Sequence, residues 1–342
     1  MATRIFTTFA VAALLGAASP ASATQPKDIR WATGPVGSAG DKALVVLAGV
    51  LNKALPEYRI TVLPTPGAVT TVKGFAIGDF DGYYGSDVAL KELKADNGRF
   101  QGFKSHIKQQ PIQSFWCYTL DVGLGIKASE RGRYKKWGDL TGQTVYTGPL
   151  PFDTRRQLEN ALAVLNVHHV YQQVDLSTVG SQLSSGAIKA MGIYAAGGET
   201  PPPWLAEASL SVDWAPLNPS ADEVAKLRAA GFTIEEADPA YFHLKHPYVK
   251  RVTLLPFYWG FDLGHILSAD EMYKMLLVIE KHADELAKLD PGFRQISGGR
   301  MAAFEKKALE STWNLVPIHP GLAKYMKARG VWDSKWDSNV AK

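Results

Sequence analysis

Two long apolar segments rich in aromatic residues, 113–127 and 251–265, bracket the middle third of the chain. The shorter apolar runs around them alternate with stretches of helical periodicity, a pattern typical of parallel sheets covered by helices. We interpret the two long segments as strands that cross between two lobes. Lobe one then comprises residues 26–120 and 255–342, and lobe two comprises residues 121–254. The alternative is that both segments are ordinary buried strands of one larger sheet.

The N-terminus has the features of a secretory signal peptide. Arg4 precedes an apolar stretch at 5–18, and the small residues Ala21-Ser22-Ala23 come directly before Thr24. The apolar stretch is shorter than the roughly 20 residues that a membrane span needs, which argues against an uncleaved anchor. We therefore expect cleavage after Ala23 and export to the periplasm.

Composition limits the partners and cofactors of the chain. Cys117 is the single cysteine, which excludes an internal disulfide and a thiolate metal cluster. The formal charge of +4 is spread without basic blocks, so nucleic acid is not an expected partner. We expect a monomer that uses neither a metal nor another cofactor.

Capping patterns predict helices between the apolar runs. Ser220 with Glu223 and Ser268 with Glu271 fit the capping box, in which two side chains bond reciprocally to free amides at a helix start. We expect the second of these helices to continue to about Leu289. Besides the two long segments, the predicted strands are IRWATG, YRITVLPT, FDGYYG, TVYTG and AMGIYA.

A glycine-rich turn, TGPVGSAGDK at 33–42, follows the first predicted strand and leads into a helix. Its spacing fits neither the nucleotide-binding loop G-x-x-x-x-G-K-[S/T] nor the dinucleotide fingerprint. Free amides and the helix dipole still predict an anion site there, and the glycines let a ligand approach the backbone. Ser38 and Asp41 form a capping pattern. We favour the capping role for Asp41 because a carboxylate would repel an anionic ligand.

A second turn of this kind lies in the middle third, where the segment 149–156 leads from a strand into a helix. Asp153 or Thr154 can cap this helix. Arg155 and Arg156 fall in its first turn, where the dipole disfavours cations, so an anion facing one of them would explain the placement. Simple solvent exposure explains either residue taken alone equally well. Two helix starts suited to anion binding, one in each lobe, predict a cleft that closes on a small acid.

The order and spacing of several motifs resemble the TAXI-type solute receptors of tripartite ATP-independent periplasmic (TRAP) transporters. The most specific is AFEKKALESTWNLVPIHPGLAKYMKARGVW near the C-terminus, supported by TGPVGSAGDKALVVLAGVLNK, TPGAVTTVKGFAIGDFDGYYGSDVA, WGDLTGQTVYTGP and SSGAIKAMGIYAAGGETPPPW. The resemblance implies an α/β, two-lobed type II periplasmic binding protein fold, in which two hinge strands join mostly parallel sheets flanked by helices. It also implies a receptor that captures a small carboxylate or amino-acid-like acid and hands it to TRAP permease subunits in the membrane.

The resemblance implies ligand contacts from both lobes. They are Gly37, Ser38, Ala39, Gly40, Thr70, Thr71, Gly85, Ser86, Asp87, Phe152, Asp153, Thr154, Arg155, Tyr194 and Gly197. The chain departs from the family where Gly40-Asp41 replaces a usual Tyr-Tyr pair and where residues 67–71 replace a Gly-Ser-x-x-Asn pattern. We infer that the pocket loses an aromatic wall and an amide, which puts a glutamate-like ligand in doubt. We also expect Gly40 to leave room for a bulkier acid.

Two other classes of function stay open from the sequence. The first is an enzyme, but the histidines lack metal-binding spacing, no G-x-S-x-G elbow is present, and Cys117 falls in a predicted buried strand where a thiol is inert. We interpret His319 as part of a turn. The second is a receptor that presents its ligand to a membrane-bound sensor kinase, and it would use the same cleft.

Overall fold

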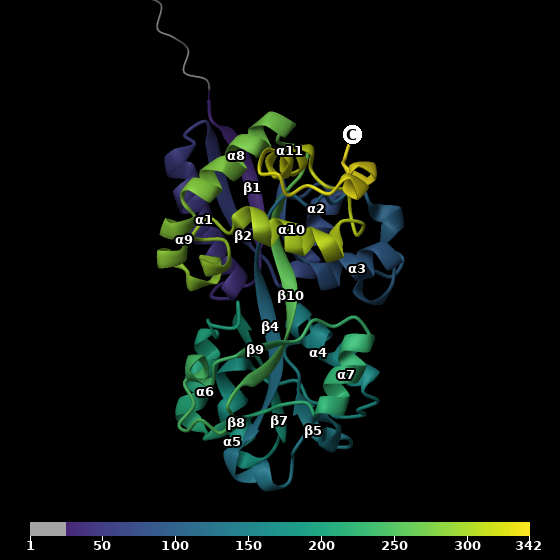
Figure 1. Ribbon diagram of the computed structural model, residues 1–342, viewed down its shortest axis with the longest axis vertical. Coiled ribbons are helices and arrows are strands. Elements are labelled where there is room, and N and C mark those ends of the chain that lie inside the picture. Colours follow the sequence, from purple (N-terminus) through teal and green to yellow (C-terminus); the bar gives the residue numbers. More distant parts are fainter. Residues whose placement is uncertain (1–24) are drawn as a thin grey trace, which may run out of the picture.

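The computed structural model describes residues 25–342 (Figure 1). The predicted signal peptide lies outside these residues. Two long strands, β4 (Trp116–Lys127) and β10 (Val252–Leu263), run through the middle of the molecule and connect two groups of helices and strands. Within the described residues, no helix combines the length and the apolar character needed to cross a membrane.

The strands form one path in the order β2-β1-β3-β10-β4-β7-β5-β6, with β8 paired to β4 and β9 paired to β10. Parallel pairs lie toward both ends of this path, and antiparallel pairs lie around β4 and β10. The remaining strands are β1 (Lys27–Thr33), β2 (Tyr58–Pro64), β3 (Gly82–Ser86), β5 (Thr144–Tyr146), β6 (Val170–Tyr171), β7 (Ala190–Ala196), β8 (Trp214–Leu217) and β9 (Glu235–Ala237).

The two halves of the sheet repeat one strand order. In lobe one the order is β2-β1-β3-β10-β4, with β1 parallel to both neighbours and β10 antiparallel to both. In lobe two it is β6-β5-β7-β4-β8, with β5 parallel to both neighbours and β4 antiparallel to both. This repeated order, with two long strands crossing between the halves, defines a type II periplasmic binding protein fold. The predicted fold class is confirmed, whereas the residue boundaries given above for the lobes stay a prediction.

Helices flank each half of the sheet, and the C-terminal helices return to the same end of the molecule as the first three (Figure 1). The helices of lobe one are α1 (Ala39–Ala54), α2 (Ala68–Ile77), α3 (Asp87–Ala95), α8 (Ala269–Lys281), α9 (Ala283–Leu289), α10 (Met301–Thr312) and α11 (Pro320–Ala328). Those of lobe two are α4 (Asp153–Val164), α5 (Val179–Ser185), α6 (Pro203–Ser211) and α7 (Ala221–Ala229).

The capping boxes are confirmed at the starts of α7 and α8, where each serine accepts from the glutamate amide and each glutamate accepts from the serine amide. The single helix expected from residue 269 to about Leu289 is wrong. The chain turns at His282, so α8 and α9 are separate helices. Strands β6, β8 and β9, each of two to four residues, were not predicted.

The two hinge strands pair antiparallel with each other, from Leu255 opposite Val122 to Gly260 opposite Trp116. The register shifts between Trp259 and Gly260. In β4 every residue but the last is buried, which explains why this strand reads as an unbroken apolar run rather than an alternating one. The interpretation of these segments as hinge strands is confirmed.

Each hinge strand also carries a fully buried carboxyl group. Asp262 in β10 accepts from the amides of Ser114 (2.6 Å) and Phe115 (3.2 Å), whereas Oδ1 of Asp121 in β4 has no hydrogen-bond partner. Burial raises the pKa of Asp121 and that of Asp262 to about 7, because desolvation disfavours the charged form.

Asp121→Asn should change how stability depends on pH. The ordinary pKa of this carboxyl is 3.8, so the unfolded chain loses the proton at lower pH than the folded chain, and stability from this group falls as pH rises from about 4 to about 7. The variant lacks this loss. Its free energy of unfolding should therefore rise relative to the wild type across that window, by up to about 1.4 kcal/mol per pKa unit. Urea unfolding near both ends of the window measures the effect, and an equal wild type-to-variant difference at both ends would contradict it.

Candidate functional site

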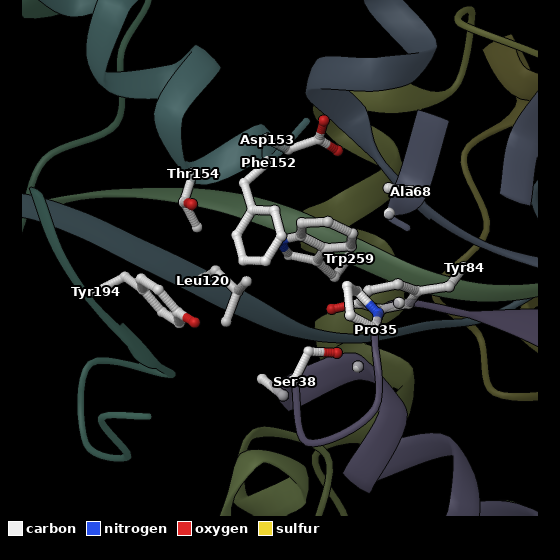
Figure 2. Close-up of a pocket in the computed structure, with 14 residues that line it drawn as sticks. Pro35, Ser38, Ala68, Tyr84, Leu120, Phe152, Asp153, Thr154, Tyr194 and Trp259 are labelled. Carbon is white, nitrogen blue, oxygen red and sulfur yellow. The ribbon is translucent and has the colours of Figure 1, made fainter. Parts of the chain in front are cut away.

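A cavity lies between the lobes, beside the paired strands β4 and β10 (Figure 2). The space between its walls, including the part open to solvent, is about 400 Å³. Residues from lobe one, from lobe two and from both hinge strands line it. They are Gly34, Pro35, Ser38, Ala39, Gly40, Gly67, Ala68, Tyr84, Leu120, Phe152, Asp153, Thr154, Tyr194 and Trp259.

Three helices begin at the cavity wall, α1 and α2 from lobe one and α4 from lobe two. At the start of α1 the Ser38 Oγ accepts from the amide of Asp41 (3.2 Å). The Asp41 carboxylate in turn accepts from the amide of Gly37 (3.0 Å). The capping role predicted for Asp41 is therefore confirmed, with Gly37 as its partner.

The starts of α2 and α4 have no side-chain cap. Gly67 at the start of α2 has no side chain, and Phe152 at the start of α4 has no polar side-chain atom. The prediction that Asp153 or Thr154 caps α4 is wrong, because both residues lie within the helix. Amides in a first helical turn have no acceptor inside the helix. Those of α2 and α4 can therefore donate to an anion in the cavity.

An aromatic wall closes the side of the cavity next to α1. Tyr84 of β3 stacks on Trp259 with ring centroids 4.2 Å apart, and its hydroxyl lies 2.7 Å from that of Tyr118. A Cβ atom at Gly40 would lie 2.2 Å from the Tyr84 ring. The space expected beside Gly40 is thus already filled. Tyr84 supplies the aromatic wall whose loss the Gly40-Asp41 pair suggested, so Gly40 leaves no room for a bulkier acid.

About half of the predicted contact residues line the cavity. They are Ser38, Ala39, Gly40, Phe152, Asp153, Thr154 and Tyr194. The others lie behind the wall or beyond it: Thr71 and Ser86 bond to neighbouring groups, Asp87 pairs with Lys91, and Gly37, Thr70, Gly85, Arg155 and Gly197 do not line the cavity.

The predicted contacts did not include Gly34, Pro35, Gly67, Ala68, Tyr84, Leu120 and Trp259. The first four lie inside the two motifs of lobe one that were singled out, 33–42 and 67–71, so membership of these motifs was the available signal. Trp259 had been considered for the cleft floor, but a core role was favoured for it. Tyr84, Leu120 and Trp259 belong to predicted buried strands, where an aromatic or aliphatic residue usually packs in the core. Nothing in their spacing separates a cavity wall from a core.

Arg155 points into lobe two rather than into the cavity. Its guanidinium carbon lies 4.1 Å from the centre of the Tyr171 ring, and its Nη2 lies 3.5 Å from Oε1 of Glu159. These contacts account for a cation in the first turn of α4 without a bound anion.

Four charged side chains join the lobes beside the cavity. Glu92 and Arg99 come from lobe one, and Asp153 and Arg156 come from α4 in lobe two. Arg99 Nε donates to Glu92 (2.6 Å) and Arg99 Nη1 donates to Asp153, while Arg156 Nε lies 2.7 Å from the second oxygen of Glu92. Ser86 also donates to Asp153. We call the four charged residues the interlobe latch. The side chain of Asp153 is fully buried, so the loss of its partner Arg99 would leave a buried charge without a counter-charge.

Arg99→Ala should favour an open form of the ligand-free protein. The change leaves Asp153 buried without its cation in the closed arrangement, and breaking a buried pair in this way costs about 3–5 kcal/mol. Small-angle scattering should then give a larger radius of gyration than the wild type.

The matched control is Arg294→Ala. Arg294 pairs with Glu199 at 3.2 Å, also between the lobes, but both side chains are exposed, so its loss should leave the scattering unchanged. Identical curves for Arg99→Ala and the wild type would contradict a role of the latch in closure.

The two groups that were weighed for catalysis from the sequence, His319 and Cys117, do not line the cavity. His319 caps α11, where its Nδ1 accepts from the Gly321 amide (3.0 Å), and burial lowers the pKa of His319 to about 4. The interpretation of His319 as part of a turn is wrong, because its backbone is extended and it lies at the start of α11. Cys117 is buried in β4, and burial raises the pKa of its thiol. Among residues 25–342, no cluster of three or more His, Cys, Asp or Glu side chains is arranged to hold a metal ion.

No model of a known protein family and no curated protein matches the sequence. Solved structures similar to this chain have low sequence identity. The periplasmic aliphatic sulphonate binding protein SsuA from Escherichia coli is 13% identical, over 93% of this chain and 84% of that chain, with a TM-score of 0.42. The alkanesulfonate-binding protein SsuA from Xanthomonas axonopodis pv. citri, bound to MOPS, is 12% identical over 93% and 96%, with a TM-score of 0.43. A putative L-cystine ABC transporter protein from Listeria monocytogenes is 12% identical over 78% and 95%, with a TM-score of 0.45.

Proposed function

We propose that this protein is an exported, periplasmic receptor that captures a small organic acid between its lobes and delivers it to the permease subunits of a TRAP transporter. The observation that carries the proposal is the convergence of helix starts from both lobes on one cavity beside two hinge strands. The motifs that resemble TAXI-type receptors support the transporter partner. In this proposal the mature chain begins at Thr24 and acts as a monomer, without a metal or other cofactor.

The proposed contacts are backbone donors rather than charged side chains. An acid group held between the lobes accepts from amides at Ala39 and Ala68 in lobe one and at Thr154 in lobe two, each in the first turn of its helix. The hydroxyls of Ser38 and Tyr194 also line the cavity. Arg155 has no part in this arrangement.

Ligand binding must favour the closed form for the receptor to report that it is occupied. A shift from 1:99 to 99:1 between two states requires about 5.5 kcal/mol of differential binding. Two or three hydrogen bonds to a charged group, at about 1.5–3 kcal/mol each, supply this if they form only when the lobes meet. The interlobe latch adds cross-lobe contacts in the closed form, so it sets how much of this difference the ligand must provide.

The first experiment is native mass spectrometry of the purified mature protein, which gives the mass of any small molecule that it carries. Calorimetry with a broad panel of organic acids then measures affinity. Small-angle scattering with and without the best binder measures closure. Absence of binding and of closure across the whole panel would contradict the proposed function.

Ala68→Pro should weaken binding of the best acid in the panel by about tenfold, the value of one hydrogen bond to a charged group. Proline is tolerated at the first position of a helix, but it removes the amide donor of Ala68, the first residue of α2, which lines the cavity. Calorimetry gives the affinity, and thermal unfolding without ligand shows whether the fold is intact.

The control is Ala221→Pro, because Ala221 is the first residue of α7 and does not line the cavity. It should bind the acid as tightly as the wild type. Equal affinities for all three proteins would exclude the α2 amides from the site.

A further inference from the structure

We propose that the ligand is an acid with a single negative charge and an apolar body, rather than a dicarboxylate or an amino acid. This inference rests on the proposed receptor function and concerns the substrate class of the same cavity. Three independent features of the cavity wall support it: its charges, the orientation of its aromatic rings, and one buried donor without a partner.

The charges of the wall leave no place for a second ionised group. Among the described residues that line the cavity, Asp153 alone has a charged side chain, and none is Lys or Arg. Its carboxylate accepts from Ser86 and Arg99, and its side chain is fully buried, so its oxygens are not exposed to a ligand ammonium. A second carboxylate on the ligand would lie near Asp153 without a counter-charge, at a cost in desolvation and repulsion.

Tyr84, the centre of the aromatic wall, offers little of its ring face to a ligand cation. The Tyr84 ring stacks on Trp259 at 4.2 Å and on Phe261 at 4.9 Å between centroids, and Tyr84 is only 4% exposed. Little of its electron-rich face is therefore open to the cavity. A ligand cation needs such a face, whereas ring edges carry partial positive charge. Tyr84 therefore offers no open ring face to an ammonium group.

Trp259 offers a donor that nothing in the described chain accepts. The residue is 4% exposed, and its indole Nε1 is buried with no hydrogen-bond partner. Figure 2 shows this nitrogen on the edge of the indole toward Phe152, another residue of the wall. Because an indole N–H can only donate, the group that satisfies it must be an acceptor. A ligand oxygen in the cavity meets this requirement. The same acid group can also accept from the amides at the starts of α2 and α4.

The rest of the wall is apolar. Pro35, Ala39, Ala68, Leu120 and Phe152 surround the space that the acid group does not occupy. An alkyl or aryl body buried there contributes through removal of apolar surface from water.

Two matched series of probes test the charge class by calorimetry on the mature protein. The six-carbon series is hexanoate, adipate, norleucine and hexanamide, and the aromatic series is benzoate, terephthalate, phenylglycine and benzamide. In at least one series we expect the monoanion to bind about tenfold or more tightly than its dianion, its amino acid and its neutral amide.

The other outcomes separate the two proposals. A dicarboxylate or amino acid as the tightest binder, in these series or as the molecule identified by native mass spectrometry, would overturn the inference and leave the receptor function standing. Failure of every organic acid to bind would remove the receptor function itself.

Trp259→Phe tests the unpartnered donor. For the tighter-binding of hexanoate and benzoate, the variant should lose about tenfold in affinity, and its loss for the corresponding neutral amide should be smaller. Comparing acid with amide separates the missing N–H from the altered ring shape, which affects both probes.

Trp332→Phe is the control, because the Trp332 indole donates to Asp337 (3.1 Å) outside the cavity. It should bind both probes as the wild type does. An equal loss of acid and amide in Trp259→Phe would show that the indole N–H does not contact the charged group.

Discussion

The antiparallel pairing of β4 with β10 is the constraint on which the rest of the molecule depends. These two strands run through both halves of the sheet, so lobe movement must bend or twist this ribbon. The cavity lies beside their crossing, where Leu120 and Trp259 form part of its wall. The ribbon therefore fixes one side of the site while the helix starts of the two lobes approach from either side.

The cavity and the latch divide the electrostatic work between dipoles and full charges. Helix starts line the cavity, while Arg99 and Arg156 beside it pair with Glu92 and Asp153. In the proposed site, amides stabilise one negative group. They do so without a permanent positive charge, which would need its own solvation when the cavity is empty. The full charges instead pair with one another between the lobes.

The main features of the fold could be predicted because their causes are local. The segment of β4 is a continuous apolar run because both of its faces are buried, and the caps at Ser220 and Ser268 involve residues three positions apart. The glycine-rich turn likewise marked the start of α1. By contrast, the repeated strand order of the two lobes has no counterpart in repeated sequence, because different side chains build the same topology.

The cavity was predicted only in part because its other determinants are not local. Tyr84 fills the space beside Gly40 although 43 residues separate them along the chain, and Arg99 meets Asp153 across the lobes. Phe152 lies at the start of α4, where the neighbouring Asp153 and Thr154 offered better capping chemistry. Asp153 instead accepts from Ser86 and Arg99, which belong to the other lobe and lie far from it in the sequence.

The repeated strand order gives the cavity an internal symmetry. In each half, the strand that lies parallel between two others leads into a helix that begins at the cavity: β1 leads into α1, and β5 leads into α4. The two helix starts are therefore topological counterparts. Duplication of a single ancestral half would suffice to place a helix start on both sides of the cavity. The two halves would then keep the same backbone arrangement around a ligand while their side chains diverged.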